Sequence, residues 1–330
     1  MNQPFATCHF KDSKFYNTPP TQALKKDVFW KMLKIIFNAD AYRPQHALPM
    51  QAPDWHMFFN QNKTAQCIWL GHSSLLIRMA KTTILIDPCF YQHASPLPIM
   101  MKRFQAPPIA LADLPKIDYI LISHNHYDHL DHQVIAFYQK KDCQFIVPLG
   151  LGKQLQAWGI DSHRIHELDW WQNHQHHNLN ITAVPARHNS ARGMFDRDCS
   201  LWAGFVLHTA QEKIYFSADS SYGEHFKQIG DYFNGFDLVL MENGQYNDSW
   251  PDNHMFPAQT IQAVQDCQAK VWMPIHWGAY ALALHPWYEP VQQSMALAQQ
   301  YQLHSVTPMM GQVFDKDSLT MLWWEDLIEA

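Results

Sequence analysis

The stretch Ile117 to His132, IDYILISHNHYDHLDH, constrains the fold of this 330-residue chain more than any other. Its first seven residues are almost continuously apolar, which predicts a short strand buried on both faces. Four side chains with metal affinity follow it: His124, His126, Asp128 and His129. Alternate residues of an extended chain point the same way, so His124 and His126 are placed to bind one ion together. Asp128 and His129 lie where the chain turns into a helix and are placed to face a second ion.

These side chains offer imidazole nitrogens and carboxylate oxygens, which suit zinc, although iron or manganese also fits. The chain has 21 His, so a His-rich surface turn is the alternative. The ordered H-x-H-x-D-H spacing directly after a strand favours a metal site over that alternative. By contrast, the polar tract QNHQHHN predicts a solvated loop, with three histidines that bind no metal: His174, His176 and His177.

Four ligands cannot complete the coordination of two ions, so further ligands are expected downstream. Three candidates each end an apolar, strand-like run and open a polar loop: His188, Asp219 and His276. Loops at one edge of a sheet commonly build active sites. The repeated placement therefore predicts that these three side chains join the cluster.

The rest of the chain alternates strand-like and helix-like segments. Two apolar runs are separated by Ala80-Lys81, which predicts a hairpin. Further strands are predicted at residues 144–148, 179–185, 201–208, 213–219, 236–242 and 270–276. Helices are predicted at residues 131–139, 152–158, 258–267 and 288–301. This interleaving predicts a layered α/β fold, with residues 61–330 as one domain and residues 1–60 as an N-terminal extension.

Composition narrows the setting in which the chain works. The net charge is −6 and no long Lys/Arg run occurs, so a nucleic-acid partner is not expected. The six Cys are scattered with no C-x-x-C pair, which predicts free thiols in a reducing compartment. The first residues do not resemble a signal peptide, and no apolar stretch is long enough to span a bilayer. We therefore expect a cytoplasmic protein.

The N-terminal extension contains one amphipathic segment, Lys25 to Phe37, which predicts a helix. Its apolar face is expected to consist of Phe29, Trp30, Leu33, Ile36 and Phe37. The favoured interpretation is a helix packed on the core with its lysines in water. The alternative is a basic helix lying on the inner face of the membrane. The sequence leaves open whether the extension is a lid, a contact in a homodimer or a membrane anchor.

A second segment, Pro96 to Pro115, is apolar and rich in Pro, and it carries Lys102-Arg103. Such a loop is able to contact lipid. Wrapping over the core is the commoner fate of apolar segments.

The order of a strand, H-x-H-x-D-H, His, Asp and His resembles the ligand order of the metallo-β-lactamase superfamily, over about residues 65–325. The resemblance implies an αββα sandwich with a first metal held by His124, His126 and His188. It implies a second metal held by Asp128, His129 and His276, with Asp219 bridging both. The true lactamases of the superfamily carry Cys in place of Asp219, so antibiotic hydrolysis is not expected. Its diiron oxygen reductases replace an early His by Glu and add a flavin domain, and this chain does neither.

Several segments are similar to the branch of N-acylphosphatidylethanolamine-hydrolysing phospholipase D: WLGHSSLLI, IDPCF, LPKIDYILISHNHYDHLD, ARHNSARG and IHWGAYALALHPWYEP. ADSSYG departs from the G-D-T-G-Y-like run of that branch, which puts the shape of the loop beside Asp219 in doubt. The resemblance implies two Zn²⁺ and hydrolysis of a phospholipid to phosphatidic acid and an N-acylethanolamine.

The same resemblance assigns roles to three residues. Asp128 is a catalytic candidate because it binds metal and can orient the attacking hydroxide. His254, in NHMFPAQ, is a second catalytic candidate, which orients the phosphate or assists the leaving group. His285 is a weaker candidate for substrate binding. His72, in GHSS, either approaches the floor of the site or binds the backbone at a tight turn.

Two other functions remain open at this point. The same metal hydroxide can attack a carbonyl carbon, so a hydrolase of small substrates such as lactones is one alternative. A catalytically silent metal-binding scaffold is the other. A long apolar channel favours a lipid substrate, a small polar pocket favours a lactone, and a protein group that blocks the bridging water favours the scaffold.

Overall fold

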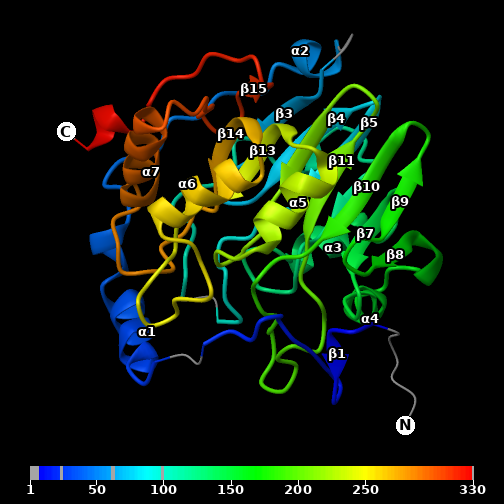
Figure 1. The fold of residues 1–330 in the computed structure, drawn as a ribbon, viewed down its shortest axis with the longest axis horizontal. Coiled ribbons are helices and arrows are strands. Elements are labelled where there is room, and N and C mark those ends of the chain that lie inside the picture. The colour runs from blue at the N-terminus through cyan, green and yellow to red at the C-terminus, as the bar shows by residue number, and fades with distance from the viewer. Residues whose placement is uncertain (1–6, 23–24, 61–63, 98–99, 329–330) are drawn as a thin grey trace.

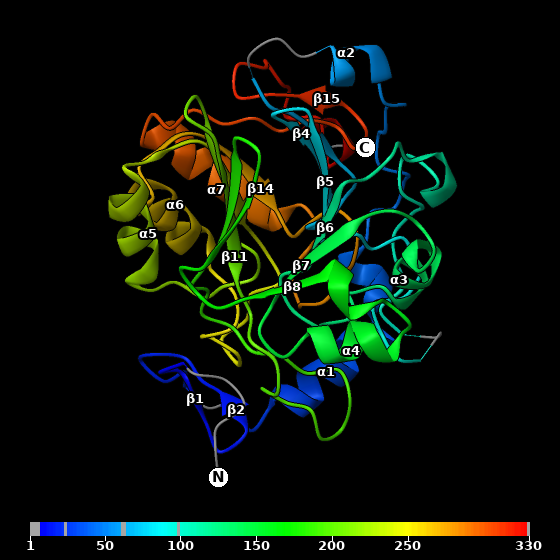
Figure 2. The same ribbon diagram turned by 90° about the vertical axis from the view of Figure 1, so that its right-hand side faces the viewer.

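The computed structural model describes residues 7–22, 25–60, 64–97 and 100–328. It confirms the predicted αββα sandwich: two mixed sheets face each other, and helices cover their outer faces (Figures 1 and 2). The first sheet has the strand order β15-β3-β4-β5-β6-β7-β8. Its strands are β3 (Gln66–Trp69), β4 (Leu75–Met79), β5 (Thr82–Ile86), β6 (Tyr119–Leu121), β7 (Gln144–Pro148), β8 (Ile165–Leu168) and β15 (Val313–Phe314).

The second sheet has the strand order β14-β13-β12-β11-β10-β9. Its strands are β9 (Asn173–His176), β10 (Leu179–Val184), β11 (Gly204–His208), β12 (Lys213–Phe216), β13 (Phe236–Glu242) and β14 (Ala269–Ile275). β5, β6 and β7 are parallel neighbours in the first sheet, and β12, β13 and β14 are parallel neighbours in the second. The carboxyl ends of parallel strands share one edge, so the loops that follow them are brought together.

The helices lie on the two outer faces. α3 (His132–Tyr138) and α4 (Gly152–Ala157) flank the first sheet, and α5 (His225–Phe233), α6 (Pro257–Asp266) and α7 (Glu289–Gln300) flank the second (Figure 2). α2 (Trp55–Phe59) lies beside β3. Short 3₁₀ turns occur at Ala39–Tyr42, Leu111–Asp113, Ser162–Arg164 and Glu325–Leu327. The four helices predicted after residue 130 are confirmed to within about one residue at each end, which is the usual uncertainty of helix bounds.

Three layers of buried side chains hold the sandwich together. The central layer lies between the sheets and combines residues of both, such as Ile77, Ile84, Phe205 and Phe216. A second layer joins the first sheet to α3 and α4, and a third joins the second sheet to α5, α6 and α7. The strands β3 and β5 have no exposed residue, and most of their residues are apolar, as expected of strands that are covered on both faces.

The predicted hairpin at Ala80-Lys81 is confirmed. β4 and β5 pair antiparallel from Leu75–Ile86 to Met79–Thr82, and both turn residues have positive φ. A two-residue turn with positive φ at both positions matches the twist of the strands that flank it.

The prediction of a solvated loop at His174, His176 and His177 was wrong. His174 and His176 belong to the edge strand β9, and His177 lies in its turn to β10. His174 is half-buried, and its Nε2 lies 3.1 Å from the hydroxyl of Tyr119. The polar composition of an edge strand concealed it, because edge strands often carry polar side chains.

The N-terminal residues form a small hairpin, β1 (Phe10–Lys11) and β2 (Lys14–Phe15), followed by the helix α1 (Val28–Phe37). The helix is confirmed, but the face predicted to pack was largely wrong. Val28, Met32 and Ile35 pack on Trp250 and its neighbours. By contrast, the side chains of three aromatic residues are 62, 65 and 78 % exposed: Phe29, Trp30 and Phe37.

Arg103 agrees with the favoured interpretation of the segment from Pro96 to Pro115, in which the loop wraps over the core. It is buried, and its guanidinium donates to the backbone oxygens of Leu70, Cys89 and Gln105. All six cysteines are free thiols, as predicted. Within the described residues, no helix has the length and apolarity to cross a membrane. The boundary between the extension and the domain at residues 60 and 61 stays a prediction.

Candidate metal centre

The predicted ligands converge at the edge of the sandwich where the parallel strands end. His124 follows β6, Asp219 follows β12 and His276 directly follows β14. His188 follows β10, which runs antiparallel to β11 and therefore in the same direction as β12. The sequence placed each residue at the end of an apolar run, and the two sheets bring those ends together.

The first donor group consists of three imidazoles: His124, His126 and His188. Nε2 of His124 lies 2.9 Å from Nδ1 of His126, and Nε2 of His188 lies 3.2 Å from the same Nδ1. The Nδ1 of His188 faces the backbone oxygen of Asn253 at 3.0 Å. A ring nitrogen that donates to a carbonyl leaves the opposite nitrogen unprotonated, so Nε2 of His188 is available to a metal.

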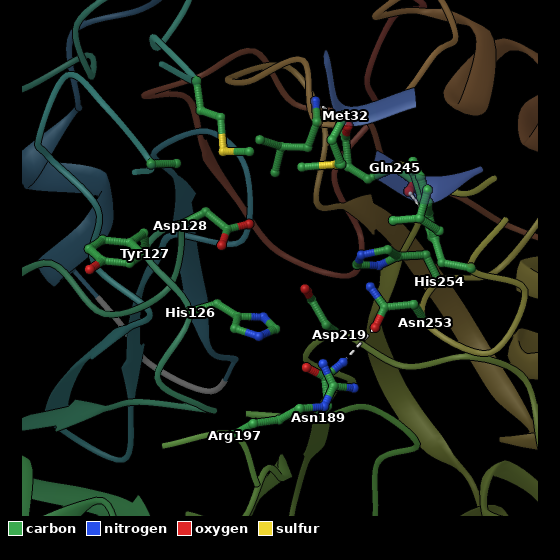
Figure 3. A pocket seen from close by; sticks show the side chains of 15 residues that line it. Met32, His126, Tyr127, Asp128, Asn189, Arg197, Asp219, Gln245, Asn253 and His254 are labelled. Carbon is green, nitrogen blue, oxygen red and sulfur yellow. Dashed lines mark hydrogen bonds between the residues drawn. The ribbon is translucent and has the colours of Figure 1, made fainter. Parts of the chain in front are cut away.

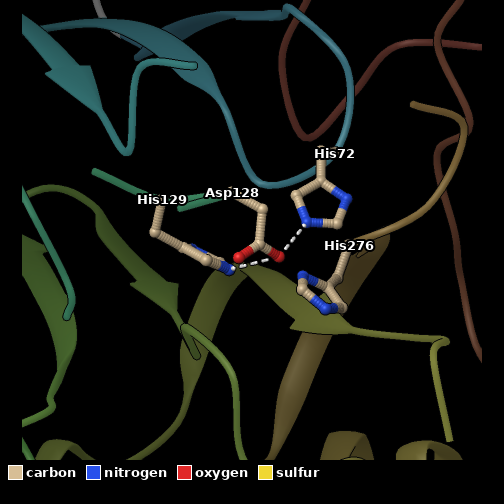
Figure 4. Close-up of side chains that lie close together, drawn as sticks. All are labelled: His72, Asp128, His129 and His276. Carbon is tan, nitrogen blue, oxygen red and sulfur yellow. Dashed lines mark hydrogen bonds and ion pairs between the residues drawn. The ribbon is translucent and has the colours of Figure 1, made fainter. Parts of the chain in front are cut away.

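The second donor group combines a carboxylate with two imidazoles: Asp128, His129 and His276. Figure 4 shows these side chains around one small space, together with His72. Nδ1 of His129 lies 2.7 Å from the carboxylate of Asp87, which fixes the ring and leaves Nε2 facing inward. Donor atoms of His72, Asp128, His129 and His276 lie within 4.8 Å of one another.

Asp219 lies between the two donor groups. Its Oδ2 is 3.8 Å from Nε2 of His124, 3.7 Å from Nε2 of His188 and 3.1 Å from Nε2 of His129. Its Oδ1 is 2.9 Å from Nδ1 of His276. This position is the one expected of a carboxylate that bridges two ions.

Comparison with known proteins agrees with this geometry. A sequence profile described as a β-lactamase superfamily domain matches residues 82–277, more than half of the chain. The chain belongs to the β-lactamase superfamily. The fold and the His/Asp clusters are those of the metal-dependent hydrolases of this superfamily.

Similar proteins include one whose function is uncharacterised and one that is named as an enzyme. An uncharacterised Mycobacterium tuberculosis protein is 35 % identical over 96 % of this chain and 87 % of its own length. A Caenorhabditis elegans N-acyl-phosphatidylethanolamine-hydrolyzing phospholipase D is 30 % identical over 67 % of this chain and 65 % of its own length. Among solved structures, the diiron β-hydroxylase CmlA from Streptomyces venezuelae has a TM-score of 0.59 at 16 % identity, over 77 % of this chain and 55 % of its own. That likeness concerns the fold alone.

The donor chemistry of this superfamily member fits divalent metal ions. Nε2 of His276 is buried without a hydrogen-bond partner among the described residues. Buried nitrogens without a partner are costly, and a metal ion satisfies them. The three imidazole nitrogens of the first group lie within 4.8 Å of one another and are likewise arranged as ligands of one ion.

The protonation state of the imidazole side chains differs between the two donor groups. Burial, with the neighbouring imidazoles, lowers the pKa of His124 well below its usual range, and burial lowers the pKa of His188 to about 3. Burial also opposes the charged form of His129, but Asp219 and Asp128 outweigh burial and raise the pKa of that ring well above its usual range. Burial opposes ionisation of Asp219, yet the nearby imidazoles of His129 and His276 outweigh it and hold the carboxyl pKa well below its usual range.

A cavity of about 320 Å³ opens onto this centre (Figure 3). His126, Asp128, Asp219 and His254 contribute to its lining. Asp128 and Asp219 both line the open cavity, so the described residues leave space for a water molecule beside them. This observation disfavours a scaffold in which a protein group takes the place of the water.

The two predicted substrate residues have different positions. His254 lines the cavity, and its ring stacks on His276 with centroids 4.9 Å apart. His285 does not line the cavity. Its Nε2 accepts the backbone N–H of Gln245 at 2.9 Å, and its ring stacks on Tyr246. Both ring nitrogens have protein partners, because Nδ1 also lies 3.0 Å from the backbone oxygen of Pro286. The structure therefore gives His285 contacts that hold a loop.

Sequence reasoning missed Asp87 and Glu242, and of the two roles that it left open for His72 the structure supports the one at the floor of the site. Asp87 follows β5 and accepts from His129, from the backbone N–H of Ser123 and from its hydroxyl. His72 lies 2.8 Å from Oδ2 of Asp128 through its Nε2. Glu242, the last residue of β13, contacts His254. Asp87 and Glu242 each follow or end a strand-like run, and that placement is the signal by which they could have been found.

Proposed function

We propose that this hydrolase is a phosphodiesterase of phospholipase D type, acting on N-acylphosphatidylethanolamine-like lipids to give N-acylethanolamine and phosphatidic acid. The observation that carries the proposal is the apolar wall of the metal-lined cavity. Five apolar side chains form much of that wall: Val28, Met32, Ala94, Met101 and Leu282. Such a wall suits acyl chains, and the named Caenorhabditis elegans relative has this substrate class.

The two donor groups and Asp219 would hold two divalent ions, which would supply hydroxide at neutral pH and offset negative charge on phosphate oxygens. We propose zinc, because imidazole and carboxylate donors suit it, and iron or manganese also fits these donors. Asp128 accepts from His72 through Oδ2, so this contact holds the carboxylate in one orientation beside the cavity. An oriented carboxylate is able to accept a proton or hydrogen bond from the attacking water.

The helix α1 supports access from a membrane surface. Val28 and Met32 face the cavity, while Phe29 and Trp30 on the same helix are 62 and 65 % exposed. Lys25, Lys26 and Lys34 are exposed around them. Exposed aromatic rings among lysines suit an anionic phospholipid surface, which attracts each lysine by about 1 kcal/mol.

The loop at residues 189–199 also exposes large apolar side chains beside the cavity. Met194 and Phe195 are 90 and 91 % exposed, and Arg197 of this loop lines the cavity. We therefore propose peripheral contact with an anionic bilayer, with substrate passing between α1 and the loop at residues 189–199 to the metal centre. A homodimer that buries the same aromatic side chains is the competing outcome of the test below.

The function is tested on purified protein of known metal content, with N-acylphosphatidylethanolamine in vesicles, a chromogenic phosphodiester and a chromogenic lactone. We expect about two metal ions per chain, turnover of both phosphodiesters and at least a 10²-fold loss in Asp128→Ala. Asp118→Ala is the matched control, because Asp118 pairs with Arg78 in the first sheet away from the cavity. Lactone turnover without phosphodiester turnover would overturn the proposal.

Membrane contact is tested separately by sedimentation with vesicles of anionic and of neutral phospholipid. The variant Phe29→Ser/Trp30→Ser is expected to bind anionic vesicles about ten- to a hundredfold more weakly, because two aromatic side chains no longer enter the lipid. Tyr232→Ser on α5, where the ring is 68 % exposed, should bind as the wild type does. Equal binding by all three proteins, or a loss of dimer in the double variant, would contradict membrane contact.

A further inference from the structure

A buried carboxylate–imidazole pair, Glu242 and His254, lies beside the metal centre, and neither residue belongs to the two donor groups. Glu242 ends β13 and is 0 % exposed, and His254 lies in the loop before α6. Oε1 of Glu242 is 2.7 Å from Nδ1 of His254, and Oε2 accepts the backbone N–H of Met255 at 3.2 Å. Both carboxylate oxygens are therefore engaged by two consecutive residues of one loop.

This engagement fixes the direction of the ring of His254. Because Nδ1 faces Glu242, the opposite nitrogen Nε2 is turned away from β13, on the side where His254 lines the cavity (Figure 3). The ring stacks on His276 at 4.9 Å with an interplanar angle of 22°, and lies 5.3 Å from the ring of His188. His254 is thus held against both donor groups, and among the described residues its Nε2 has no hydrogen-bond partner.

The backbone of Glu242 is fixed by side-chain hydrogen bonds, so its carboxylate is held toward the loop that carries His254. Its own backbone N–H donates to the hydroxyl of Ser217, and its carbonyl accepts from the hydroxyl of Thr260. The ion pair of Glu242 in the described part of the chain is the one with His254. A buried carboxylate whose ion-pair partner is an imidazole beside a cavity orients that imidazole, as a carboxylate does in hydrolytic triads.

We propose that Glu242 is a positioning residue, which holds His254 so that Nε2 meets the leaving-group oxygen of a phosphodiester bound at the metal centre. This inference rests on the proposed function. In the step, the hydroxide oxygen forms the new bond to phosphorus and the scissile P–O bond breaks with its electron pair on the leaving oxygen. That oxygen takes the proton of Nε2 from the doubly protonated ring, which returns to the neutral form with Nδ1–H still facing Glu242. The ring regains its proton from the water molecule that becomes the attacking hydroxide. The carboxylate of Glu242 stabilises the ring while Nε2 carries the proton.

The role predicts a dependence on the leaving group. The alkoxide of an N-acylethanolamine is strongly basic and needs a proton as it departs, whereas p-nitrophenolate departs readily without one. If His254 loses its orientation, cleavage of a substrate with an alkoxide leaving group should therefore slow far more than cleavage of a substrate that releases p-nitrophenolate. A residue that merely stabilised the fold would affect both alike.

The experiment compares N-acylphosphatidylethanolamine with phosphatidyl-p-nitrophenol, which differ in the leaving group. The carboxylate of Glu242 faces two donors, Nδ1 of His254 and the backbone N–H of Met255. In Glu242→Gln one of these donors faces an amide NH₂ instead. We therefore expect kcat for N-acylphosphatidylethanolamine to fall about 10²-fold. The loss with the nitrophenyl lipid should stay below about tenfold, with KM little changed. Glu212→Gln is the matched control, since Glu212 is buried and accepts the backbone N–H of Ala65 in another part of the fold. Equal losses on both lipids, or the same pattern in Glu212→Gln, would overturn the proposal.

Two further readouts separate this inference from the proposed function. Metal content of Glu242→Gln is expected to stay at the wild-type value, and loss of an ion would show His254 to be a ligand instead. In the metal-free wild type, NMR should find an exchange-protected proton on Nδ1 of His254, and Glu242→Leu should remove that protection. Absence of that proton in the wild type would overturn the positioning role even if the enzyme hydrolyses both lipids. If neither lipid is hydrolysed while the proton is present, the contact stands and the phosphodiesterase proposal fails.

Discussion

The first donor group consists of three imidazoles, whereas the second sets two imidazoles among carboxylates, although both groups lie at one edge of the same sandwich. Burial lowers the pKa values of His124, His126 and His188, so these rings are neutral at pH 7 before any ion arrives. The carboxylates around His129 outweigh burial and raise its pKa, so that ring holds a proton which an ion must displace. Metal binding at the second group therefore releases a proton from His129, whereas metal binding at the first group does not displace one.

The source of this difference is the distribution of carboxylates. Asp219 approaches both groups, but Asp128 and Asp87 contact only the second, at 3.4 Å from Nε2 and 2.7 Å from Nδ1 of His129. A second ion bound there meets more negative charge than the first does. We expect the second group to depend more strongly on its carboxylates, and the following variants test that expectation.

The largest effect is expected for Asp219→Ala, because its carboxylate approaches both groups. Both ions should be lost, and phosphodiester turnover should fall by roughly 10³-fold or more, on the scale of the several kcal/mol that metal ions supply. Metal content by elemental analysis measures the first effect. Asp237→Ala is the control, because Asp237 pairs with Lys270 on the far part of the second sheet and should leave both ions in place. Retention of one tightly bound ion would show that Asp219 belongs to one group alone.

The next largest effect is expected for variants that remove a ligand from one donor group alone, because each should lose one ion. His188→Ala should empty the first group and His276→Ala the second, with metal content falling from about two to about one ion per chain in each case. The remaining ion differs between the two variants. X-ray absorption should find three imidazole ligands on it in His276→Ala and fewer in His188→Ala. The same ligand count in both variants would contradict the division into two groups.

A carboxylate that touches no metal should have a smaller effect again. Asp87→Asn removes the charge that holds Nδ1–H of His129, and such changes weaken metal binding about 10–100-fold. Competition with a chelator measures this loss, which should fall on the second ion. Asp131→Asn is the control: Asp131 is also buried, and it accepts the backbone N–H groups of Phe90, Tyr91 and Gln133. Equal weakening of both ions in Asp87→Asn would show that its effect is not confined to the second group.

The convergence of the seven candidate ligands could be predicted from the sequence because each lies in the H-x-H-x-D-H run or at the end of an apolar run. Local pattern reveals such placement. The contact between Asp87 and His129, 42 positions apart, depends on β5 and β6 lying side by side, which no local pattern states. For the same reason His254 and His285 looked alike, since both are loop histidines and only the tertiary fold turns one toward the cavity.

The amphipathic segment of α1 shows a second limit. Its periodicity predicted a helix correctly, but an amphipathic helix with many apolar residues offers more than one face for packing. Val28, Met32 and Ile35 meet Trp250, and this left Phe29 and Trp30 in solvent. The side that packs is decided by the shape of the partner, which becomes known only with the fold.

The last difference between the groups is their response to pH. In the metal-free protein the raised pKa of His129 keeps that ring protonated at neutral pH, so the second ion binds with release of a proton. Its affinity should rise with pH as far as the raised pKa of His129, because below that pKa a proton competes with the ion. The lowered pKa values of the first group leave its rings largely unprotonated at neutral pH, so the affinity for the first ion should change less with pH. Titration with a coloured chelator at pH 6, 7 and 8 measures both affinities. His276→Ala supplies the control, because a protein that holds only the first ion should give a nearly flat profile, and a steep profile in that variant would reverse the assignment of the proton to the second group.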